Sequence, residues 1–473
     1  MSVFGTLIIG GVSMADLSKI KSVHCIGIGG IGLSAIAEIL LNRGYLVSGS
    51  DIKESNITKH LERLGAIIHY DHRAENVENA DMLIYSSAVY SENPEIIKAK
   101  EMNIPIKSRA EMLGYLMDEY ENSIAICGTH GKTTTTSMVS LIIRRANLKP
   151  TILVGGELNE INGNVEVGNS PYFVTEACEY MDSFLNLKPR IGVILNIDSD
   201  HLDYFKDMDH IVSSFKNFAG KVKEDGIIVA YNANPFVMEA ISEKKNTLTY
   251  GYSNDSDYFV NNISFDDMGM SEFDLYKKGE FQIRIKLNVP GEHNILNAMA
   301  AYATCDYLKI PKETIAETLE AFKGTHRRFD VRGMSKKGFK IVDDYAHHPT
   351  EIKATLSAIA NIKHKKLWCI FQPHTYTRTM ALLEEFANAF DGTDKLIIPD
   401  IYAAREQNIY NVTSETLVKI IKEKHPQKDV VYMEDFEEIA NLIYNEAEDG
   451  DLVLTMGAGD VYKIGERILE IES

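Results

Sequence analysis

Two glycine-rich loops constrain the fold of this chain more than any other feature of its sequence. The first is the G-x-G-x-x-G run at 27–32, and the second is the Gly-Thr-His-Gly-Lys-Thr-Thr run at 128–134. Each loop follows a short apolar stretch typical of a buried strand and opens a helical pattern, at 31–43 and 135–144. A strand, a glycine loop and a helix in succession begin a βαβ unit, so the loops predict two α/β units with parallel sheets.

Apolar runs and helical patterns keep alternating along the chain, which favours an α/β fold throughout. The chain has 473 residues, and single cores stop growing near roughly 300 residues, so we expect several domains. We predict an extension at 1–21, then domains at 22–120, 121–325 and 326–473, with a β-rich insertion at 254–280. Strands are predicted at 23–27, 45–48, 81–86, 124–127, 172–175, 191–196, 340–342, 367–371, 395–398 and 452–456, and further helices at 57–64 and 94–102.

The composition is that of a globular protein, with 45% hydrophobic and 25% charged residues. A formal net charge of −19 argues against nucleic-acid binding and stable membrane association, because phosphate groups would repel the chain. The five cysteines are scattered without a C-x-x-C pair, which suits a reducing cytoplasm. The apolar run 3–12 is too short to span a bilayer, so we expect a loosely attached extension, with Met14 as an alternative start.

The first loop has the spacing of a diphosphate-binding turn. Glycines there let the backbone approach a diphosphate that sits on the helix N-terminus. Asp51 ends the second predicted strand, where an acid can bond a ribose hydroxyl. Taken alone, the loop indicates NAD or FAD, and a tight turn without any ligand is the alternative.

The second loop has the chemistry of an ATP site. Its backbone N–H groups can cradle phosphates, Lys132 can reach the β- and γ-phosphates, and the Thr133 hydroxyl can hold Mg²⁺. A dehydrogenase has no use for an ATP loop, and a simple ATPase has no use for a separate diphosphate-binding domain. The pair therefore predicts an enzyme that joins a nucleotide-diphosphate substrate to a second substrate at the expense of ATP.

Further motifs along the chain resemble the Mur ligase family. They run from residue 22 to the C-terminus, outside the zone 254–280, and together they are highly specific. Beside the two loops they are Thr175-Glu176-Ala177, the run 196–203, Gly291-Glu292-His293-Asn294 with Asn297, His326-Arg327-Arg328-Phe329, the run 343–351 and Gln372-Pro373-His374.

This resemblance implies a Rossmann-like UDP-binding domain, a central P-loop ATPase-like domain with a mostly parallel sheet, and a C-terminal Rossmann-like domain. It implies that ATP phosphorylates the lactoyl carboxylate of UDP-N-acetylmuramate, after which an amine attacks the acyl phosphate. The run 343–351 is typical of the member that adds L-alanine. A close alternative adds a preformed tripeptide to the same sugar nucleotide during cell-wall recycling. ATP and Mg²⁺ would be required, and the enzyme would be cytoplasmic.

The resemblance also implies which residues form the site. Contacts to the UDP sugar are expected from Gly29, Gly30, Ile31, Asp51, Ser86 and Ser87. Contacts to ATP are expected from Gly128, Thr129, His130, Gly131, Lys132, Thr133, Thr134, His293, Asn294, Arg327 and Asp344. Amino-acid contacts are expected from His347, His348 and Arg378, metal ligands from Thr133, Glu176 and His201, and catalytic roles for Lys132, His201, Arg327 and His348.

Several roles stay open at this stage. His201 can complete a cation site, act as a base on the amine, or be a structural histidine. Of Arg327 and Arg328, one can swing onto the phosphates while the other forms a surface ion pair. Asp344 can hold the ribose or a metal-bound water, or can cap a turn. Cys178 and Tyr180 interrupt a run of acids common in the family, and Thr375 replaces an arginine found in some relatives.

Overall fold

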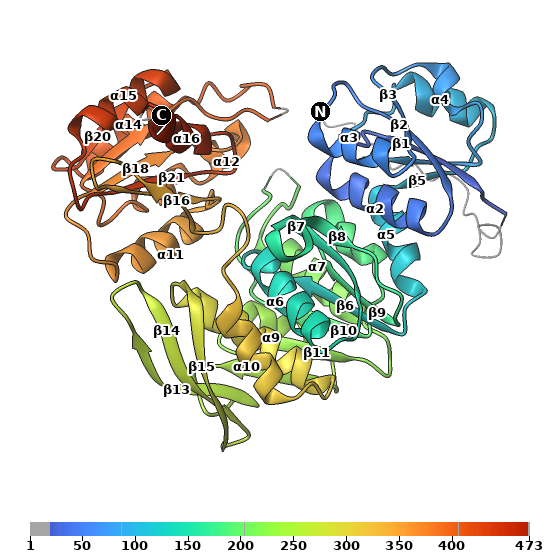
Figure 1. Cartoon of the computed structure of the whole chain (residues 1–473), viewed down its shortest axis with the longest axis horizontal. Coiled ribbons are helices and arrows are strands. Elements are labelled where there is room, and N and C mark those ends of the chain that lie inside the picture. Colours follow the sequence, from blue (N-terminus) through green and yellow to red (C-terminus); the bar gives the residue numbers. More distant parts are fainter. Residues whose placement is uncertain (1–18, 87, 203, 405, 472–473) are drawn as a thin grey trace.

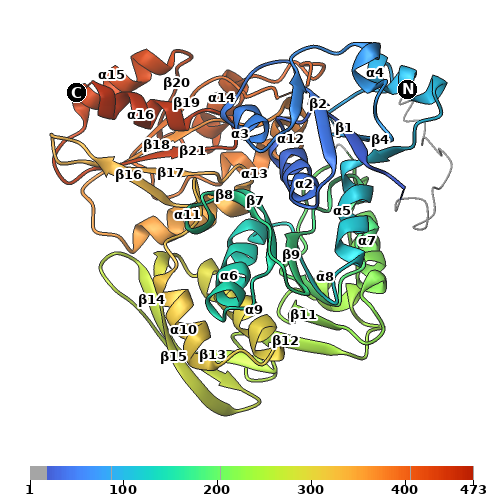
Figure 2. The same ribbon diagram turned by 45° about the vertical axis from the view of Figure 1, so that its right-hand side comes forward.

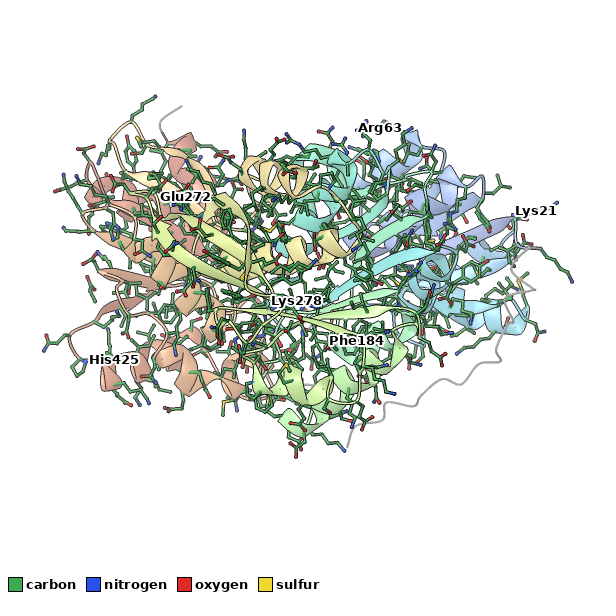
Figure 3. All side chains as sticks on the ribbon, turned by 90° about the horizontal axis from the view of Figure 1, so that it is seen from below. Lys21, Arg63, Phe184, Glu272, Lys278 and His425 are labelled. Carbon is green, nitrogen blue, oxygen red and sulfur yellow. The ribbon has the colours of Figure 1, made fainter. Side chains whose placement is uncertain are left out.

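The structure is a computed structural model that describes residues 19–86, 88–202, 204–404 and 406–471. Over these residues the chain forms three sheets, and each is covered by helices on both faces (Figure 1). The predicted extension and Met14 lie outside the described residues. Figure 3 shows Arg63 at the edge of the molecule, and the Phe184 side chain, labelled within its outline, is 1% exposed.

The first domain is built on a parallel sheet of strand order β3-β2-β1-β4-β5. Apolar side chains of α2 and α5 pack on one face, and those of α4 and η1 pack on the other. Its elements are β1 (Ser22–Ile26), α2 (Ile31–Asn42), β2 (Leu46–Ser50), α3 (Asn56–Arg63), β3 (Ile67–His69), η1 (Ala74–Val77), β4 (Met82–Tyr85), α4 (Pro94–Glu101), β5 (Ile106–Ser108) and α5 (Arg109–Asp118).

The central domain has a ten-stranded sheet of order β15-β14-β13-β12-β11-β10-β6-β9-β7-β8. Its strand pairing is parallel from β13 to β7 and antiparallel at β13-β14-β15 and β7-β8. The elements are β6 (Asn122–Cys127), α6 (Lys132–Arg145), β7 (Thr151–Leu158), η2 (Asn159–Ile161), β8 (Gly163–Glu166), β9 (Tyr172–Glu176), η3 (Tyr180–Asn186), β10 (Ile191–Ile194), α7 (Met208–Lys221), β11 (Ile227–Tyr231), α8 (Pro235–Ala240), β12 (Thr247–Gly251), β13 (Tyr258–Phe265), β14 (Met270–Lys277), β15 (Glu280–Pro290), α9 (His293–Tyr307) and α10 (Lys312–Ala321).

The C-terminal domain has a six-stranded sheet of order β16-β17-β21-β18-β19-β20, parallel except for β16. Helices α11 and α14 pack on one face, and α15 and α16 pack on the other. The elements are β16 (Asp330–Met334), β17 (Lys340–Asp344), α11 (Pro349–Ala360), β18 (Leu367–Phe371), α12 (Tyr376–Ala381), α13 (Leu383–Ala387), β19 (Lys395–Ile398), α14 (Ser414–Lys424), β20 (Asp429–Tyr432), α15 (Phe436–Glu446), β21 (Leu452–Met456) and α16 (Tyr462–Glu470).

The first two domains share one apolar core. In it Met117 and Tyr120 pack with Phe173 and Phe184, and the Tyr120 and Phe173 ring centroids are 4.9 Å apart. Figure 2 shows α2 beside β7 and β8, where the Asn164 side chain donates a hydrogen bond to the carbonyl of Ile31 over 2.9 Å. We call this contact region the first interface.

Every predicted strand and helix is present with small shifts of its ends, and the zone 254–280 is β-rich, as predicted. The strands β3, β5, β7, β8, β11, β12, β16 and β20 were not predicted, because they are short or lack a clear alternation. All five cysteines are free. Among the described residues, no helix combines the length and the apolar character needed to cross a membrane.

Candidate active site

The second glycine loop lies between β6 and α6, at the carboxyl end of the central sheet. Gly128 and Gly131 have φ values of +139° and +84°, which glycine adopts without strain. A Cβ on Gly128 would lie 2.9 Å from the Leu195 Cβ atom, so no other residue fits there. The loop backbone is fixed to the end of β10 by bonds from the Thr129 and His130 N–H groups to the carbonyl and side-chain oxygens of Asn196.

Lys132 occupies a buried ionic site at the start of α6. Its ammonium group donates to Glu179 Oε1 over 2.9 Å and to the carbonyl of Thr129 over 3.0 Å. Burial disfavours the charge, but the attraction of Glu179 outweighs it and raises the pKa of Lys132 above its ordinary value. His201 Nε2 lies 3.7 Å from the same carboxylate oxygen. Lys132 is therefore charged and held at the phosphate end of the loop.

The expected metal ligands lie around this same point. Burial raises the pKa of Glu176, and it outweighs the hydrogen bonds from the backbone of Gly155 and the side chain of Thr133, which lower this pKa. Glu179 Oε2 is buried and has no hydrogen-bond partner among the described residues. A hydroxyl and two carboxylates offer the hard oxygen ligands that Mg²⁺ prefers, and an unpaired buried carboxylate oxygen fits a bound cation.

Tyr180 and Asp182, which replace or follow the expected acids, take different roles. The Tyr180 ring lies 4.7 Å from the His201 ring. Asp182 Oδ2 accepts a hydrogen bond from the Tyr204 hydroxyl over 2.6 Å, so this carboxylate is held within the domain. Met181, Asp182 and His201 all have positive φ values, and such strain is frequent at functional sites.

A pocket of about 430 Å³ opens beside the ATP loop, between the central and C-terminal domains. Asn294 is buried and donates to the carbonyl of Pro290, and Asn297 connects it to Thr135 of α6. Lining residues from the two domains are His130, Gly131, Thr134, Asn196, Asp198, Tyr250, His293, Asn294, Asn297, Phe329, Arg328, Asp344, Thr350 and Glu351. The pocket brings together most of the residues expected to contact ATP.

Arg327 and Arg328 take different positions. Arg327 donates to Asp343 Oδ2 over 2.9 Å and to the carbonyls of Gly457 and Gly459, so its guanidinium is held inside the C-terminal domain. Arg328 lines the ATP pocket, 3.7 Å from Glu351. The geometry thus favours Arg328 over Arg327 for a phosphate contact. Asp344 accepts backbone hydrogen bonds from Phe329 and Ala346. Of the roles considered for Asp344, these contacts match the capping of a turn.

The first glycine loop lies between β1 and α2, where Gly30 is the N-cap of α2. Asp51 Oδ2 accepts a hydrogen bond from the Gly29 N–H over 2.8 Å, so this carboxylate supports the loop. Ile31 is 39% exposed, and Ser86 lies over Gly27. Ser87 lies outside the described residues. The loop is therefore open at the helix N-terminus, where a diphosphate would sit.

A second pocket of about 430 Å³ lies between the central and C-terminal domains. Arg378 donates through Nε and Nη2 to Asp200 Oδ1 over 3.1 and 3.0 Å, which joins the two domains. Burial opposes ionisation of Asp200, but Arg378 and His201 hold its pKa far below the ordinary value. Burial lowers the pKa of His374 to about 3, so this lining residue is neutral. The pocket thus holds the Asp200–Arg378 ion pair and a second carboxylate, Glu406, which accepts a hydrogen bond from the Thr377 N–H over 2.8 Å.

His347 and His348 lie near this pocket at the start of α11. His348 Nε2 lies 2.9 Å from the carbonyl of Ser199 and His347 Nδ1 lies 2.9 Å from the carbonyl of Tyr345. Burial lowers the pKa of His347 to about 4 and that of His348 below its ordinary value. These neutral rings add no positive charge beside Arg378.

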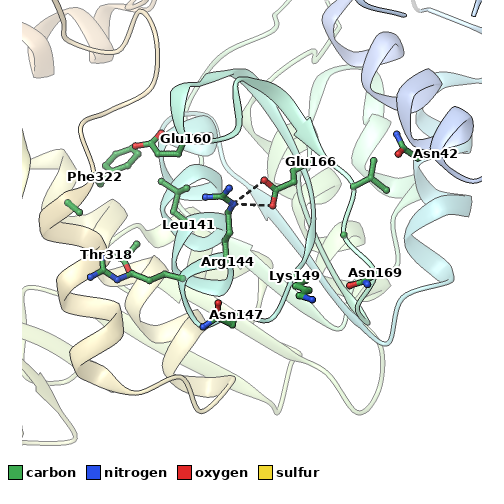
Figure 4. A pocket seen from close by; sticks show the side chains of 14 residues that line it. Asn42, Leu141, Arg144, Asn147, Lys149, Glu160, Glu166, Asn169, Thr318 and Phe322 are labelled. Atoms are coloured by element: carbon green, nitrogen blue, oxygen red, sulfur yellow. Dashed lines mark hydrogen bonds and ion pairs between the residues drawn. The ribbon is translucent and has the colours of Figure 1, made fainter. Parts of the chain in front are cut away.

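A larger hollow, about 950 Å³, lies away from both loops (Figure 4). Its Arg144 bonds both carboxylate oxygens of Glu166, and Arg145 bonds Glu317. Because these exposed charges are paired, size alone does not make this hollow the active site.

Comparisons with known proteins agree with the motifs. The Mur ligase catalytic-domain model matches residues 22–121, the Mur ligase middle-domain model matches 126–305, and the model described as Mur ligase, glutamate ligase domain, matches 327–459. A UDP-N-acetylmuramate–L-alanine ligase of Alkaliphilus metalliredigens is 50% identical over 96% of this chain and 98% of its own length. The chain belongs to the Mur ligase family.

Two further relatives agree. A UDP-N-acetylmuramate–L-alanine ligase of Clostridium tetani is 50% identical over 97% of this chain and 100% of its own length. The crystal structure of a UDP-N-acetylmuramate–alanine ligase of Thermotoga maritima superposes with a TM-score of 0.80 at 30% identity, covering 96% of this chain and 99% of that one. The predicted family and its three-domain α/β fold are confirmed.

Three charged residues at these pockets were not among the predicted site residues. Glu179 was set aside because neighbouring acids are interrupted, Arg328 because Arg327 was preferred, and Asp200 because nothing local marks its partner Arg378. The adjacent Arg-Arg pair and the acids of the run 196–203 were the signals that could have found two of them.

Proposed function

We propose that this chain is an ATP-dependent, ADP-forming ligase that joins L-alanine to the lactoyl carboxylate of UDP-N-acetylmuramate. This is the first amino-acid addition of peptidoglycan precursor synthesis. The observation that carries the proposal is the 50% identity, over nearly the whole chain, to relatives that bear this name. Addition of a tripeptide is not favoured, since a murein peptide ligase of Psychrobacter arcticus is only 23% identical, with a TM-score of 0.70.

The first step is transfer of the γ-phosphoryl group to the lactoyl carboxylate. Such a transfer asks the protein for positioning and charge stabilisation. Lys132 lies at the loop where the phosphates would bind, and Arg328 faces the same pocket from the C-terminal domain. Together they neutralise charge that builds up on the phosphoryl oxygens.

Mg²⁺ would be held by Thr133, Glu176 and Glu179, with His201 beside Glu179. The cation supplies charge neutralisation between the phosphates when it is bound. The ligand set rests on the unpaired Glu179 oxygen and on the contact between Thr133 and Glu176.

In the second step the ammonium group of L-alanine loses a proton, the free amine attacks the carbonyl carbon of the acyl phosphate, and the tetrahedral intermediate expels inorganic phosphate to leave the amide. L-alanine is a zwitterion, and the Asp200–Arg378 pair presents one charge for each of its ends. Arg378 would receive the carboxylate and Asp200 the ammonium group. Because Asp200 belongs to the central domain and Arg378 to the C-terminal one, this site is complete only when the two domains meet.

Three finer points complete the proposal. The UDP sugar would bind at Gly29, Gly30 and Ile31, with Ser86 nearby. Domain boundaries near 121 and 326 are supported by the ends of the matched family segments. We place the enzyme in the cytoplasm, where ATP is available.

A phosphate-release assay tests the function. Purified protein should release phosphate from ATP only with Mg²⁺, UDP-N-acetylmuramate and L-alanine together, and more slowly with glycine or L-serine. The Lys132→Ala variant should lose about 10²-fold in turnover, the scale of a lost transition-state charge contact. Equal turnover with a tripeptide would instead assign the chain to cell-wall recycling.

A further inference from the structure

His130 connects the two domains that enclose the ATP pocket. Its Nε2 atom lies 3.2 Å from Asp198 Oδ2 in the central domain, and its Nδ1 atom lies 3.3 Å from Glu351 Oε1 in the C-terminal domain. Two ring nitrogens facing two acceptors require a doubly protonated imidazole. Burial opposes that charge, but the hydrogen bonds to Asp198 and Glu351 outweigh it and raise the pKa of His130 to about 9.

Two more contacts join the central domain to the C-terminal domain at the same place. The Thr350 hydroxyl donates to Asp198 Oδ2 over 2.8 Å, and His348 Nε2 lies 2.9 Å from the carbonyl of Ser199. The His130 side chain is 16% exposed and that of Glu351 is 13% exposed. Charges that are this well shielded from water interact more strongly than surface ion pairs do. We call His130, Asp198, Thr350 and Glu351 the interdomain bridge.

The backbone of His130 is fixed on the loop side of the interdomain bridge. Its N–H donates to Asn196 Oδ1 over 2.8 Å, and its carbonyl accepts from Asn196 Nδ2 over 3.0 Å. The ring therefore has a set position relative to Lys132, two residues further along the loop. The mechanics of a phosphate loop need only its backbone N–H groups and its lysine, so this side chain is free for another task.

We infer that the His130 side chain is a positioning residue that fastens the C-terminal domain onto the ATP loop and thereby assembles the amino-acid pocket. The inference rests on the proposed function, because the pocket it assembles is the one assigned to L-alanine. Asp200 and Arg378 stand on opposite sides of the same domain contact. When the interdomain bridge is intact, both charges face one substrate, and when it is broken, Arg378 moves away with its domain.

The test is a double-mutant cycle with His130→Gln and Glu351→Gln. Each single variant should raise the KM for L-alanine and lower kcat by about tenfold, and the double variant should be little worse than either. The dissociation constant of UDP-N-acetylmuramate, measured by calorimetry, should stay within about twofold, because its diphosphate is assigned to the first domain, which contributes no residue to the interdomain bridge. Small-angle scattering of the ADP-bound protein should show a larger radius of gyration for each variant than for the wild type.

His60→Gln is the matched control, because it breaks a histidine–glutamate pair of similar length, His60 to Glu38 at 3.0 Å, within the first domain. It should leave KM, kcat and the radius of gyration unchanged.

Additive effects of the two substitutions, or an unchanged radius of gyration, would overturn the interdomain bridge. So would stoichiometric Zn²⁺ binding that His130→Gln abolishes, because ligand atoms of His130, Asp198 and His348 lie within 4.8 Å of one another and a metal would then replace the hydrogen bonds. If the wild type fails to use L-alanine, the proposed function fails, but the scattering comparison still tests the bridge by itself.

Discussion

The two interfaces of the central domain differ in the kind of contact that forms them. At the first interface, Met117 and Tyr120 of the first domain belong to the same apolar core as Phe173 and Phe184. At the second interface, toward the C-terminal domain, the buried contacts are mainly the ionic and hydrogen-bonded groups of the interdomain bridge and the Asp200–Arg378 pair, beside the smaller contacts of Leu202 with the C-terminal core and of Met268 with Ile362. An apolar core is lost only by unfolding, whereas a few polar bonds exchange readily with water. We therefore expect the C-terminal domain, rather than the first domain, to move relative to the central one.

The largest effect should come from Phe173→Ala at the first interface. Removal of this fully buried ring leaves a cavity beside Tyr120 and should lower the free energy of unfolding by about 3–5 kcal/mol. Urea unfolding measures the loss, and the variant that remains folded should keep its KM for L-alanine. Unfolding of the first domain apart from the central one in the wild type would contradict a shared core.

The neighbouring arginines give a matched pair for the second interface. Arg328→Ala should lower kcat by about 10²-fold with little change in melting temperature, because its side chain faces the ATP pocket. Arg327→Ala should lower the melting temperature instead, because it leaves the fully buried Asp343 carboxylate without its cation. The reverse pattern in kinetics and calorimetry would restore Arg327 as the phosphate contact.

Sequence reasoning predicted the fold and the loops, but it could not predict this distinction. The glycine loops and the alternation of apolar runs are local signals, so they can be recognised in the sequence alone. Arg327 points into its own domain, whereas Arg328 faces the pocket. This difference depends on the positive φ of +61° at Arg327, which only the folded junction imposes. The partnership of His130 with Glu351 joins residues 221 positions apart, and no local pattern encodes it.

Acid should open the second interface while the first stays closed. The hydrogen bond with His130 holds the pKa of Asp198 below its ordinary value, and the protonated His130 ring also lowers the pKa of Glu351, despite its burial. Depressed carboxyl pKa values give a contribution that is fully present above the ordinary value near 4 and is lost as pH falls from there through the depressed pKa values. Scattering followed from pH 7 down to about pH 2 should show expansion before tyrosine fluorescence reports any loss of the core.

The smallest effect should come from Thr350→Ala, which removes one neutral-to-charged hydrogen bond of the interdomain bridge. The KM for L-alanine should rise by about threefold, and Thr350→Ser, which keeps the hydroxyl, should restore it. An effect as large as that of His130→Gln would show that the bridge depends on the hydroxyl rather than on the histidine.

The shared wall of the ATP pocket has a kinetic consequence. Gly131 and Asn294 stand on one side, and Arg328, Thr350 and Glu351 stand on the other, so a nucleotide that fills the space touches both bodies. We therefore expect ADP release to wait for these bodies to part, even where its base is weakly held. The residence time of ADP then reports how often the domains separate. Because solvent viscosity slows such motions, higher viscosity should lower kcat.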